Sequence, residues 1–248
     1  MAVIALTSAR GAPGVTTTAA ALAFCWPRPL LLVEADAAGS SLLPGYLRQA
    51  AVSTRQSALA VAPSLPSEPA EAAAALLRAA VPLPGSSTAT VLPSTLIAAH
   101  PSVELWDWLA AAVDEVDLAG TDVLIDAGRL GAQNAPDPLL SAAFGTLLTT
   151  RTTMPAAEAA GDWVPYLREL TGPAASALLV VGEGQPLSHT ELTAQAGMAV
   201  AAVIGWDPVH AEVFSLGATA GHRLKDSLLL RTIRTVIEPL SQWAARPA

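Results

Sequence analysis

A short glycine-containing segment near the amino terminus has the residue types of a phosphate-binding loop. It runs from Ser8 to Thr18 and reads Ser-Ala-Arg-Gly-Ala-Pro-Gly-Val-Thr-Thr-Thr. The apolar run Val3 to Leu6 precedes it, and the Ala-rich run Ala19 to Phe24 follows it. A strand, a glycine loop and a helix amino terminus together offer backbone N–H groups and the positive end of a helix dipole to an anion. The segment therefore predicts a phosphate site.

The end of this loop departs from the usual Gly-Lys-Ser/Thr sequence, in which the lysine reaches the outer phosphates and the hydroxyl binds magnesium. Here the three residues are Gly14, Val15 and Thr16, and Lys225 is the only lysine in the chain. Val15 brings no positive charge to the place where negative charge gathers during phosphoryl transfer, so we expect hydrolysis to be slow or absent. The same residues also fit an ordinary strand-to-helix turn with Thr16 or Thr17 as the N-cap.

Carboxylates follow two further apolar runs. Glu34 and Asp36 come after the run Leu30 to Val33, and Asp126 comes directly after Val123 to Ile125. In open parallel sheets the ligand lies beyond the carboxyl ends of the strands, where a carboxylate can hold magnesium, often through water. An acid in such a loop also serves to cap the next turn, and this alternative stays open for Glu34 and Asp36.

The loop resembles the deviant Walker A segment of the ParA/MinD family of ATPases, whose pattern is Lys-Gly-Gly-x-Gly-Lys-Thr-Thr. The residues that match this pattern, in order, are Arg10, Gly11, Ala12, Pro13, Gly14, Val15, Thr16 and Thr17. Both family lysines are replaced. In the family the first lysine reaches across a dimer to the partner's nucleotide. Its counterpart here is Arg10, which keeps the positive charge but carries it on a planar guanidinium group. The second lysine corresponds to Val15.

Other segments extend this resemblance in the same chain order. Glu34 to Gly39 resembles the family's Asp-x-Asp-x-x-Gly switch segment, which implies that Asp36 lies near the magnesium and the attacking water. Asp126 resembles the Walker B acid. Trp206 and Pro208 match the proline-containing loop that borders the adenine ring, although Trp206 fits a core aromatic at a strand end equally well.

The resemblance implies ATP and Mg²⁺ as ligands. The backbone of Gly11 to Thr17 would then hold the phosphates, and the magnesium would lie among Thr16, Asp36 and Asp126. Arg10 would reach the nucleotide of a second subunit in a homodimer.

The elements that must position these residues alternate along the chain. Apolar runs rich in β-branched residues predict buried strands at Val3–Leu6, Leu30–Val33, Thr88–Leu92, Val123–Ile125, Thr146–Leu148, Leu178–Val181 and Val200–Ile204. Ala/Leu-rich stretches predict helices at Thr16–Phe24, Ala70–Ala80, Val103–Val116, Ala156–Leu170, Leu187–Ala196 and Leu228–Trp243. Such alternation predicts an α/β fold, a mostly parallel sheet with helices on both faces, in one domain over residues 1–248. Ser53 to Glu68 reads as a loop, or as a poorly formed edge strand around Ala58 to Ala62.

Composition narrows the class of protein. The formal net charge is −8, which argues against a broad nucleic-acid surface. No apolar run approaches the roughly 20 residues that cross a bilayer, and no basic region precedes a longer apolar stretch at the start, so we expect a cytoplasmic protein. The last predicted helix, Leu228–Trp243, weakly resembles the amphipathic membrane tail of MinD-like proteins. Pro239 interrupts it, so packing of this helix on the sheet is favoured.

Three functional hypotheses follow. The first is a ParA/MinD-like regulatory or positioning protein that binds ATP and Mg²⁺, dimerises in response, and then recognises a regulatory or cargo protein. The second is a pseudo-ATPase scaffold for a partner complex, which keeps the fold without nucleotide. The third is a true ATPase in which Arg10, or a partner's arginine, supplies the missing charge.

Overall fold

The computed structural model describes residues 1–10, 14–39, 41–48, 50, 68–94, 103–182 and 186–245. Within these ranges the chain forms one eight-stranded sheet with the order β3-β4-β2-β5-β1-β6-β7-β8. The strands are β1 Val3–Ser8, β2 Leu30–Glu34, β3 Val81–Pro82, β4 Ala89–Leu92, β5 Asp122–Arg129, β6 Gly145–Thr150, β7 Ser176–Val181 and β8 Val200–Ile204. All neighbouring strands run parallel except β3 and β4, which are antiparallel.

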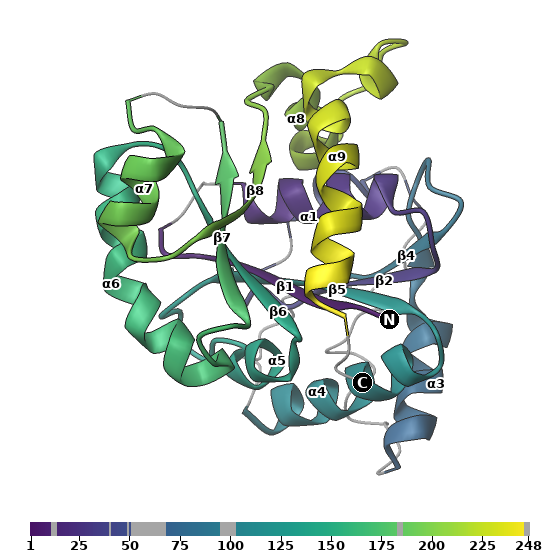
Figure 1. Ribbon diagram of the computed structural model, residues 1–248. Coiled ribbons are helices and arrows are strands. Elements are labelled where there is room, and N and C mark those ends of the chain that lie inside the picture. The colour runs from purple at the N-terminus through teal and green to yellow at the C-terminus, as the bar shows by residue number, and fades with distance from the viewer. Residues whose placement is uncertain are drawn as a thin grey trace.

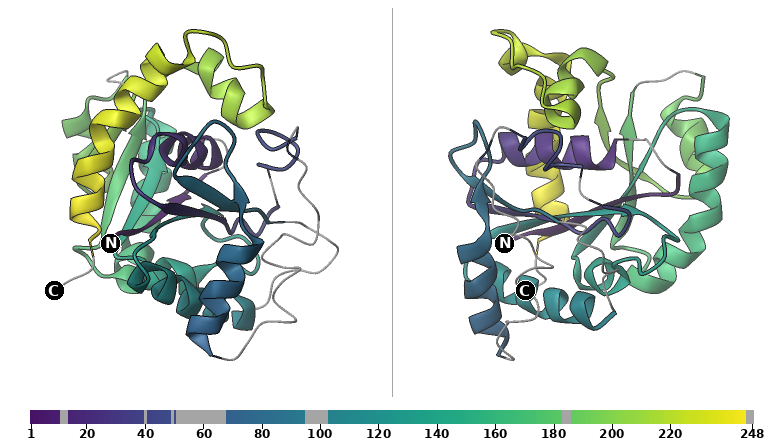
Figure 2. Two further views of the ribbon diagram at one scale, coloured as in Figure 1. Left: turned by 90° about the vertical axis from the view of Figure 1, so that its right-hand side faces the viewer. Right: turned by 180° about the vertical axis from the view of Figure 1, so that it is seen from behind.

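Helices cover both faces of this sheet (Figures 1 and 2). They are α1 Val15–Cys25, α3 Pro69–Ala79, α4 Val103–Leu118, α5 Asp137–Ala142, α6 Met154–Thr171, α7 His189–Ala196, α8 Pro208–Leu216 and α9 Leu228–Trp243, with a 3₁₀ turn, η2, at Leu224–Asp226. α1, α8 and α9 lie on one face, and α3 to α7 lie on the other. The predicted mostly parallel α/β sheet is confirmed.

Side chains alternate between the two faces of the sheet along each strand, and they form a separate hydrophobic layer on each face. In β1, Ile4 and Leu6 point into the layer beneath α1 and α9, whereas Val3 and Ala5 point into the layer beneath α4 and α6. α1 is apolar around most of its circumference because it packs against the sheet on one side and against α8 and α9 on the other. Its run of small alanines allows this close approach.

Four described elements were not predicted from sequence: β3, α5, α8 and the 3₁₀ turn η2. β3 is a two-residue antiparallel edge strand that contains Pro82, and such a strand leaves no periodic pattern. α5 and α8 are short helices that each begin with a proline in their first turn, so both stretches look like loops in the sequence. The uncertain prediction for Ala58 to Ala62 lies outside the described residues.

The last helix, α9, buries its apolar face as the sequence favoured. Leu230, Ile233, Ile237 and Leu240 are buried, and the helix contacts α1 and β8. Among the residues that the structure describes, none of the helices has both the length and the apolarity needed to span a bilayer.

Candidate functional site

The predicted acids meet at the carboxyl edge of three adjacent strands. β5 lies between β1 and β2, and in this register Asp126 stands opposite Leu6 on one side and opposite Glu34 on the other. The loop after β1 leads into α1, and the loop after β2 carries Asp36. The parallel topology therefore brings together residues as far apart in the chain as Leu6 and Asp126.

A cavity of about 280 Å³ lies at this edge. Its described lining consists of Ser8, Gly14, Val15, Thr16, Thr17, Asp36, Ser41, Gly128, Arg129 and Ser215. The lining thus combines the start of α1 with the ends of β1, β2 and β5. Gly11, Ala12 and Pro13, the middle of the predicted phosphate loop, lie outside the described residues.

The amino terminus of α1 opens onto this cavity without a side-chain cap. Gly14 is the N-cap residue and has φ 94° and ψ 36°, a left-handed conformation that favours glycine. Among the described residues, no side-chain cap accepts a hydrogen bond from the first N–H groups of α1, and no acidic residue occurs in its first turn. The alternative in which Thr16 or Thr17 is the N-cap is therefore wrong. The helix end leaves its N–H donors and positive dipole end available to an anion.

Asp126 is fully buried below the start of α1. Its Oδ1 accepts a hydrogen bond from the backbone N–H of Gly128 at 3.2 Å, and its Oδ2 is buried with no hydrogen-bond partner among the described residues. The pKa of Asp126 is raised to about 7, mainly by burial and also by the nearby charges of Glu34 and Asp36, whereas a hydrogen bond from Thr16 opposes the shift. A buried, unpaired carboxylate oxygen beside a threonine hydroxyl is suited to hold a cation through water.

Asp36 lines the cavity from the start of the loop after β2. Its Oδ1 accepts a hydrogen bond from the N–H of Ala38 at 2.8 Å, and burial raises its pKa while the charge of Arg129 lowers it. Gly128 faces this carboxylate at φ 63°, so closely that an added Cβ would overlap the Asp36 side chain. The absence of a side chain at Gly128 is what leaves Asp36 its place at the cavity.

Arg129 is a cavity residue that the sequence reasoning missed. It is exposed, it lines the cavity, and its charge acts on Asp36. The register between β1 and β5 shifts after Leu6, so that Ser8 stands opposite Arg129 at the end of the strand. This irregularity, together with the positive φ of Gly128, turns the arginine toward the cavity. The signal in the sequence was a basic residue three positions after Asp126.

Glu34, the match to the first acid of the switch segment, holds loops together. It is 1% exposed, and its Oε1 accepts hydrogen bonds from the N–H groups of Ser41 at 2.8 Å and Leu42 at 2.9 Å. Its Oε2 accepts another from the N–H of Ser94 at 2.9 Å. The carboxylate therefore caps the turn that begins at Ser41, as the alternative from sequence allowed, and it also ties this segment to the end of β4, from a buried position.

The remaining predicted residues lie apart from the described cavity lining. Arg10 is exposed just before the undescribed part of the loop. Trp206 is 53% exposed, so it is not a core aromatic, and the guanidinium carbon of Arg151 lies 3.6 Å from the centroid of its ring. Pro208 occupies the first turn of α8. The structure thus offers a stacked Trp206–Arg151 pair at the end of β8, separate from the cavity.

No protein-family model matches this chain, and no curated protein matches it. Solved structures match it over nearly its whole length. MinD in the MinC:MinD cell division complex of Aquifex aeolicus is 16% identical, with a TM-score of 0.74 over 100% of this chain and 97% of that chain. The septum site-determining protein MinD of Pyrococcus horikoshii, complexed with Mg-ADP, is 18% identical, with a TM-score of 0.73 over 98% and 97%.

A ParA family ATPase from Chlorobium tepidum is 14% identical, with a TM-score of 0.69 over 96% of this chain and 98% of that chain. At these identities the comparison concerns the fold alone. The fold of this chain is ParA/MinD-like, as the sequence motifs predicted.

Proposed function

We propose that this chain, which has a ParA/MinD-like fold, is a regulatory or positioning protein that binds ATP with Mg²⁺ and has weak or no hydrolytic activity. The observation that carries the proposal is the buried, unpaired Oδ2 of Asp126 beside Thr16, below an uncapped helix terminus. A pure scaffold has no physical need to bury a carboxylate in this way, because the burial costs stability.

The start of α1 would hold the phosphates. Its free N–H groups and dipole favour an anion, and the cavity beside them, at about 280 Å³, has room for a phosphate group and a hydrated cation. Thr16 and Asp126 would hold the magnesium, with Asp36 beside them. Bound magnesium would screen the phosphate charges. A protein with the same fold, MinD of Pyrococcus horikoshii, is a complex with Mg-ADP.

The expectation of weak hydrolysis rests on Val15, which occupies the position of the missing lysine. Val15 is 7% exposed and packs into the hydrophobic layer beneath α1, so it supplies no charge to the cavity. Among the residues that line the cavity, Arg129 is the one cation within the described part of the chain. It would offset part of the phosphate charge in the ground state, from the opposite wall.

The remaining parts of the proposal concern the base and the assembly. The exposed Trp206 ring, already stacked on Arg151, would offer a flat surface to the adenine, with Pro208 beside it. Arg10 would reach the nucleotide of a second copy. ATP binding would then drive formation of a homodimer that recognises a regulatory or cargo protein, and the MinC:MinD complex is one structure with this fold that contains a partner.

The test is calorimetric titration with a non-hydrolysable ATP analogue, with and without Mg²⁺, on the wild type and on Asp126→Ala. Light scattering on the same samples follows the oligomeric state. We expect micromolar binding that requires Mg²⁺, is lost in the variant, and is accompanied by dimerisation. An absence of binding at millimolar analogue would favour the second candidate, the nucleotide-independent scaffold, for which the apolar Val15 argues.

The identity of residue 15 should set the nucleotide affinity. In Val15→Lys, the long side chain can run from the start of α1 into the cavity and place an ammonium among the phosphates, so we expect the dissociation constant of the analogue to fall about tenfold or more. Val15→Met, which adds length without charge, is the matched control and should bind like the wild type. Equal affinity in all three proteins, measured by calorimetry, would contradict the assignment of this position.

A further inference from the structure

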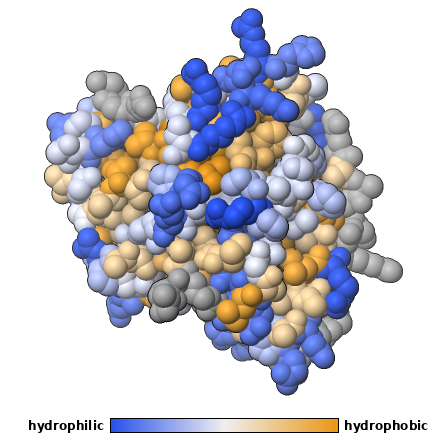
Figure 3. Space-filling model, turned by 45° about the vertical axis from the view of Figure 1, so that its right-hand side comes forward, coloured by the Kyte–Doolittle hydropathy of each residue, from blue (hydrophilic) through white to orange (hydrophobic). Residues whose placement is uncertain are grey.

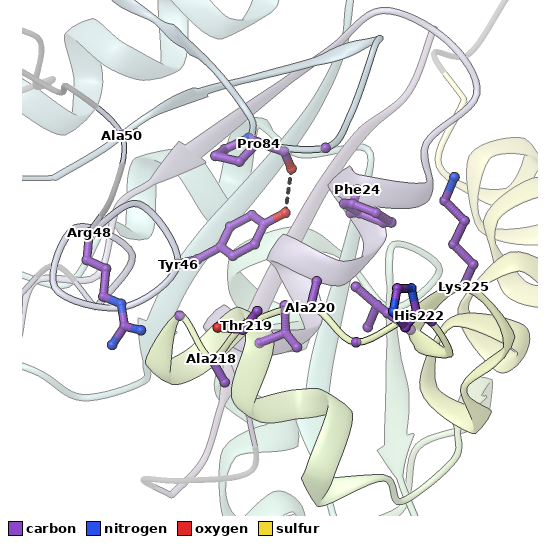
Figure 4. A pocket seen from close by; sticks show the side chains of 15 residues that line it. Phe24, Tyr46, Arg48, Ala50, Pro84, Ala218, Thr219, Ala220, His222 and Lys225 are labelled. Atoms are coloured by element: carbon purple, nitrogen blue, oxygen red, sulfur yellow. Dashed lines mark hydrogen bonds between the residues drawn. The ribbon is translucent and has the colours of Figure 1, made fainter.

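A second and larger cavity lies on the α1, α8 and α9 side of the sheet. It has a volume of about 680 Å³, in the range of ligand pockets, and none of the residues that line it lines the phosphate cavity. Its walls are the carboxyl end of α1, residues 46, 48 and 50, the turn at 84–85 and the segment 217–225 that follows α8 (Figure 4). Nothing in the proposed nucleotide chemistry uses this cavity.

The floor of the second cavity is aromatic and held in place. The rings of Phe24 and Tyr46 both pack on the buried ring of Phe214, with centroids 5.6 Å and 5.1 Å away. The hydroxyl of Tyr46 donates a hydrogen bond to the carbonyl oxygen of Pro84 at 2.5 Å, which fixes its ring across the cavity (Figure 4). A rigid aromatic floor of this kind suits an apolar or aromatic group.

Positively charged side chains lie at both ends of the aromatic floor. Figure 4 places Arg48 at one end and Lys225 with His222 at the other. No Asp or Glu is among the described residues that line the cavity, and neither Arg48 nor Lys225 forms an ion pair within the described part. The chain as a whole has a net charge of −8, and its single lysine, Lys225, lies at this cavity. The charge of the cavity lining is therefore opposite in sign to that of the whole chain. Figure 3 shows hydrophilic side chains gathered at the top of the molecule, where the chain passes from α8 to α9, with apolar surface beside them.

From this geometry we propose that the second cavity binds an acidic peptide segment of a partner protein. An aromatic or large aliphatic side chain of the peptide lies on Phe24 and Tyr46, and carboxylates on either side of it meet Arg48 and Lys225. The spacing of two cationic ends around an apolar centre favours an extended chain with acids on both flanks over a compact anion. The neighbouring stretch of this chain, residues 51–67, contains no acidic residue and does not fit this chemistry.

The second cavity shares two walls with the phosphate cavity. Ser41 lines the phosphate cavity, and Tyr46 and Arg48 of the same segment line the second. At the end of α8, Ser215 lines the first cavity and Gly217 the second. The segments touch through their backbones, since a Cβ on Gly217 would overlap the carbonyl oxygen of Gly45. We therefore expect peptide and nucleotide affinities to be coupled, an expectation that rests on the proposed function, whereas peptide binding itself does not.

The experiment is a selection of random nonapeptides displayed on phage, using the full chain as bait, followed by fluorescence anisotropy with the synthesised peptides. We expect the enriched peptides to carry one large apolar residue flanked by acids. Their affinity should fall at least tenfold with Arg48→Glu or with Lys225→Glu, and also when salt is raised from about 0.1 M to 0.5 M. Arg78→Glu, an equal charge change on α3 at the other face of the sheet, should leave the affinity unchanged.

Several results would overturn the proposal: no enrichment, enrichment of basic or neutral peptides, or equal binding to the charge-reversed variants. Two separate single substitutions, each checked by thermal melting, guard against a variant that fails to fold. Repeating the anisotropy with saturating ATP analogue and Mg²⁺ tests the coupling, for which we expect about a fivefold change in affinity. If the analogue does not bind, peptide binding still decides the assignment of the second cavity.

Discussion

Asp126→Asn is expected to raise the free energy of unfolding of the nucleotide-free protein by about 2–4 kcal/mol at pH 8, measured by guanidinium denaturation. In the folded chain the pKa of Asp126 is about 7, because burial disfavours the charged carboxylate. In the unfolded chain it is near its ordinary value of 3.8. Above pH 7 the folded wild type must therefore hold a buried negative charge that has no ion-pair partner among the described residues. Asparagine has almost the same shape and removes that charge.

The sign of the pH dependence follows from the raised pKa. The folded state of the wild type binds the proton more tightly than the unfolded state does, so this carboxyl favours the folded state fully below pH 3.8 and loses that contribution as the pH rises through 7. The advantage of Asp126→Asn should therefore be largest at pH 8 and shrink to about 1 kcal/mol or less by pH 4.5.

Two controls separate this effect from a general change in charge. Asp107→Asn removes the same charge from an exposed position of α4, and it should shift the unfolding midpoint little at either pH. Adding the ATP analogue with Mg²⁺ should stabilise the wild type against unfolding and leave Asp126→Asn unchanged. If Asp126→Asn is no more stable than the wild type at pH 8, or if its advantage persists unchanged at pH 4.5, the buried charge is not where the structure places it.

Glu34→Ala should have the opposite effect, lowering the free energy of unfolding by about 3–5 kcal/mol. The Glu34 carboxylate accepts hydrogen bonds from the N–H groups of Ser41, Leu42 and Ser94, and Leu42 and Ser94 are buried. Removing it leaves these donors without an acceptor and frees the segment after β2 from the end of β4. Denaturant unfolding at pH 7 measures the loss.

Asp36→Ala is the matched control for Glu34→Ala, because it removes the other acid of the same motif. Among the described residues its carboxylate accepts one hydrogen bond, from the N–H of Ala38, and burial already raises its pKa, so we expect a change within about 1 kcal/mol. Glu34→Gln should fall between wild type and Glu34→Ala, since its amide group keeps one acceptor oxygen. Should Asp36→Ala prove the more destabilising of the two acid-to-alanine changes, the division between an anchoring Glu34 and a cavity-lining Asp36 would be reversed.

Much of the fold was present in local sequence patterns. The seven predicted strands are all found, because short apolar runs between Ala/Leu-rich stretches report burial on both faces directly. Of the elements missed, β3, α5 and α8 are short and contain proline, and η2 is a single three-residue turn, so their existence depends on neighbours that hydrogen-bond or pack against them. β3, for example, exists only as the antiparallel edge partner of β4.

The candidate site was predicted in its parts and assembled only by the fold. The sequence by itself determined a glycine loop without its lysine, an acid at the end of a buried strand, and a chain order that matched a ParA/MinD-like sheet. It did not determine the separate roles of Glu34 and Asp36, because these depend on the donors around each carboxylate, and one donor to Glu34, the N–H of Ser94, lies 60 residues away in the chain.

Tertiary structure alone decided the rest. Arg129 reaches the cavity because an irregularity in the β1–β5 register and the backbone of Gly128 turn it there. The second cavity brings together α1, the segment after β2, the turn at 84–85 and the segment after α8, and none of the residues that line it belongs to one of the motifs found in the sequence. Local patterns report what each residue prefers, whereas a site depends on the distances between groups far apart in the chain, and those distances are set by packing.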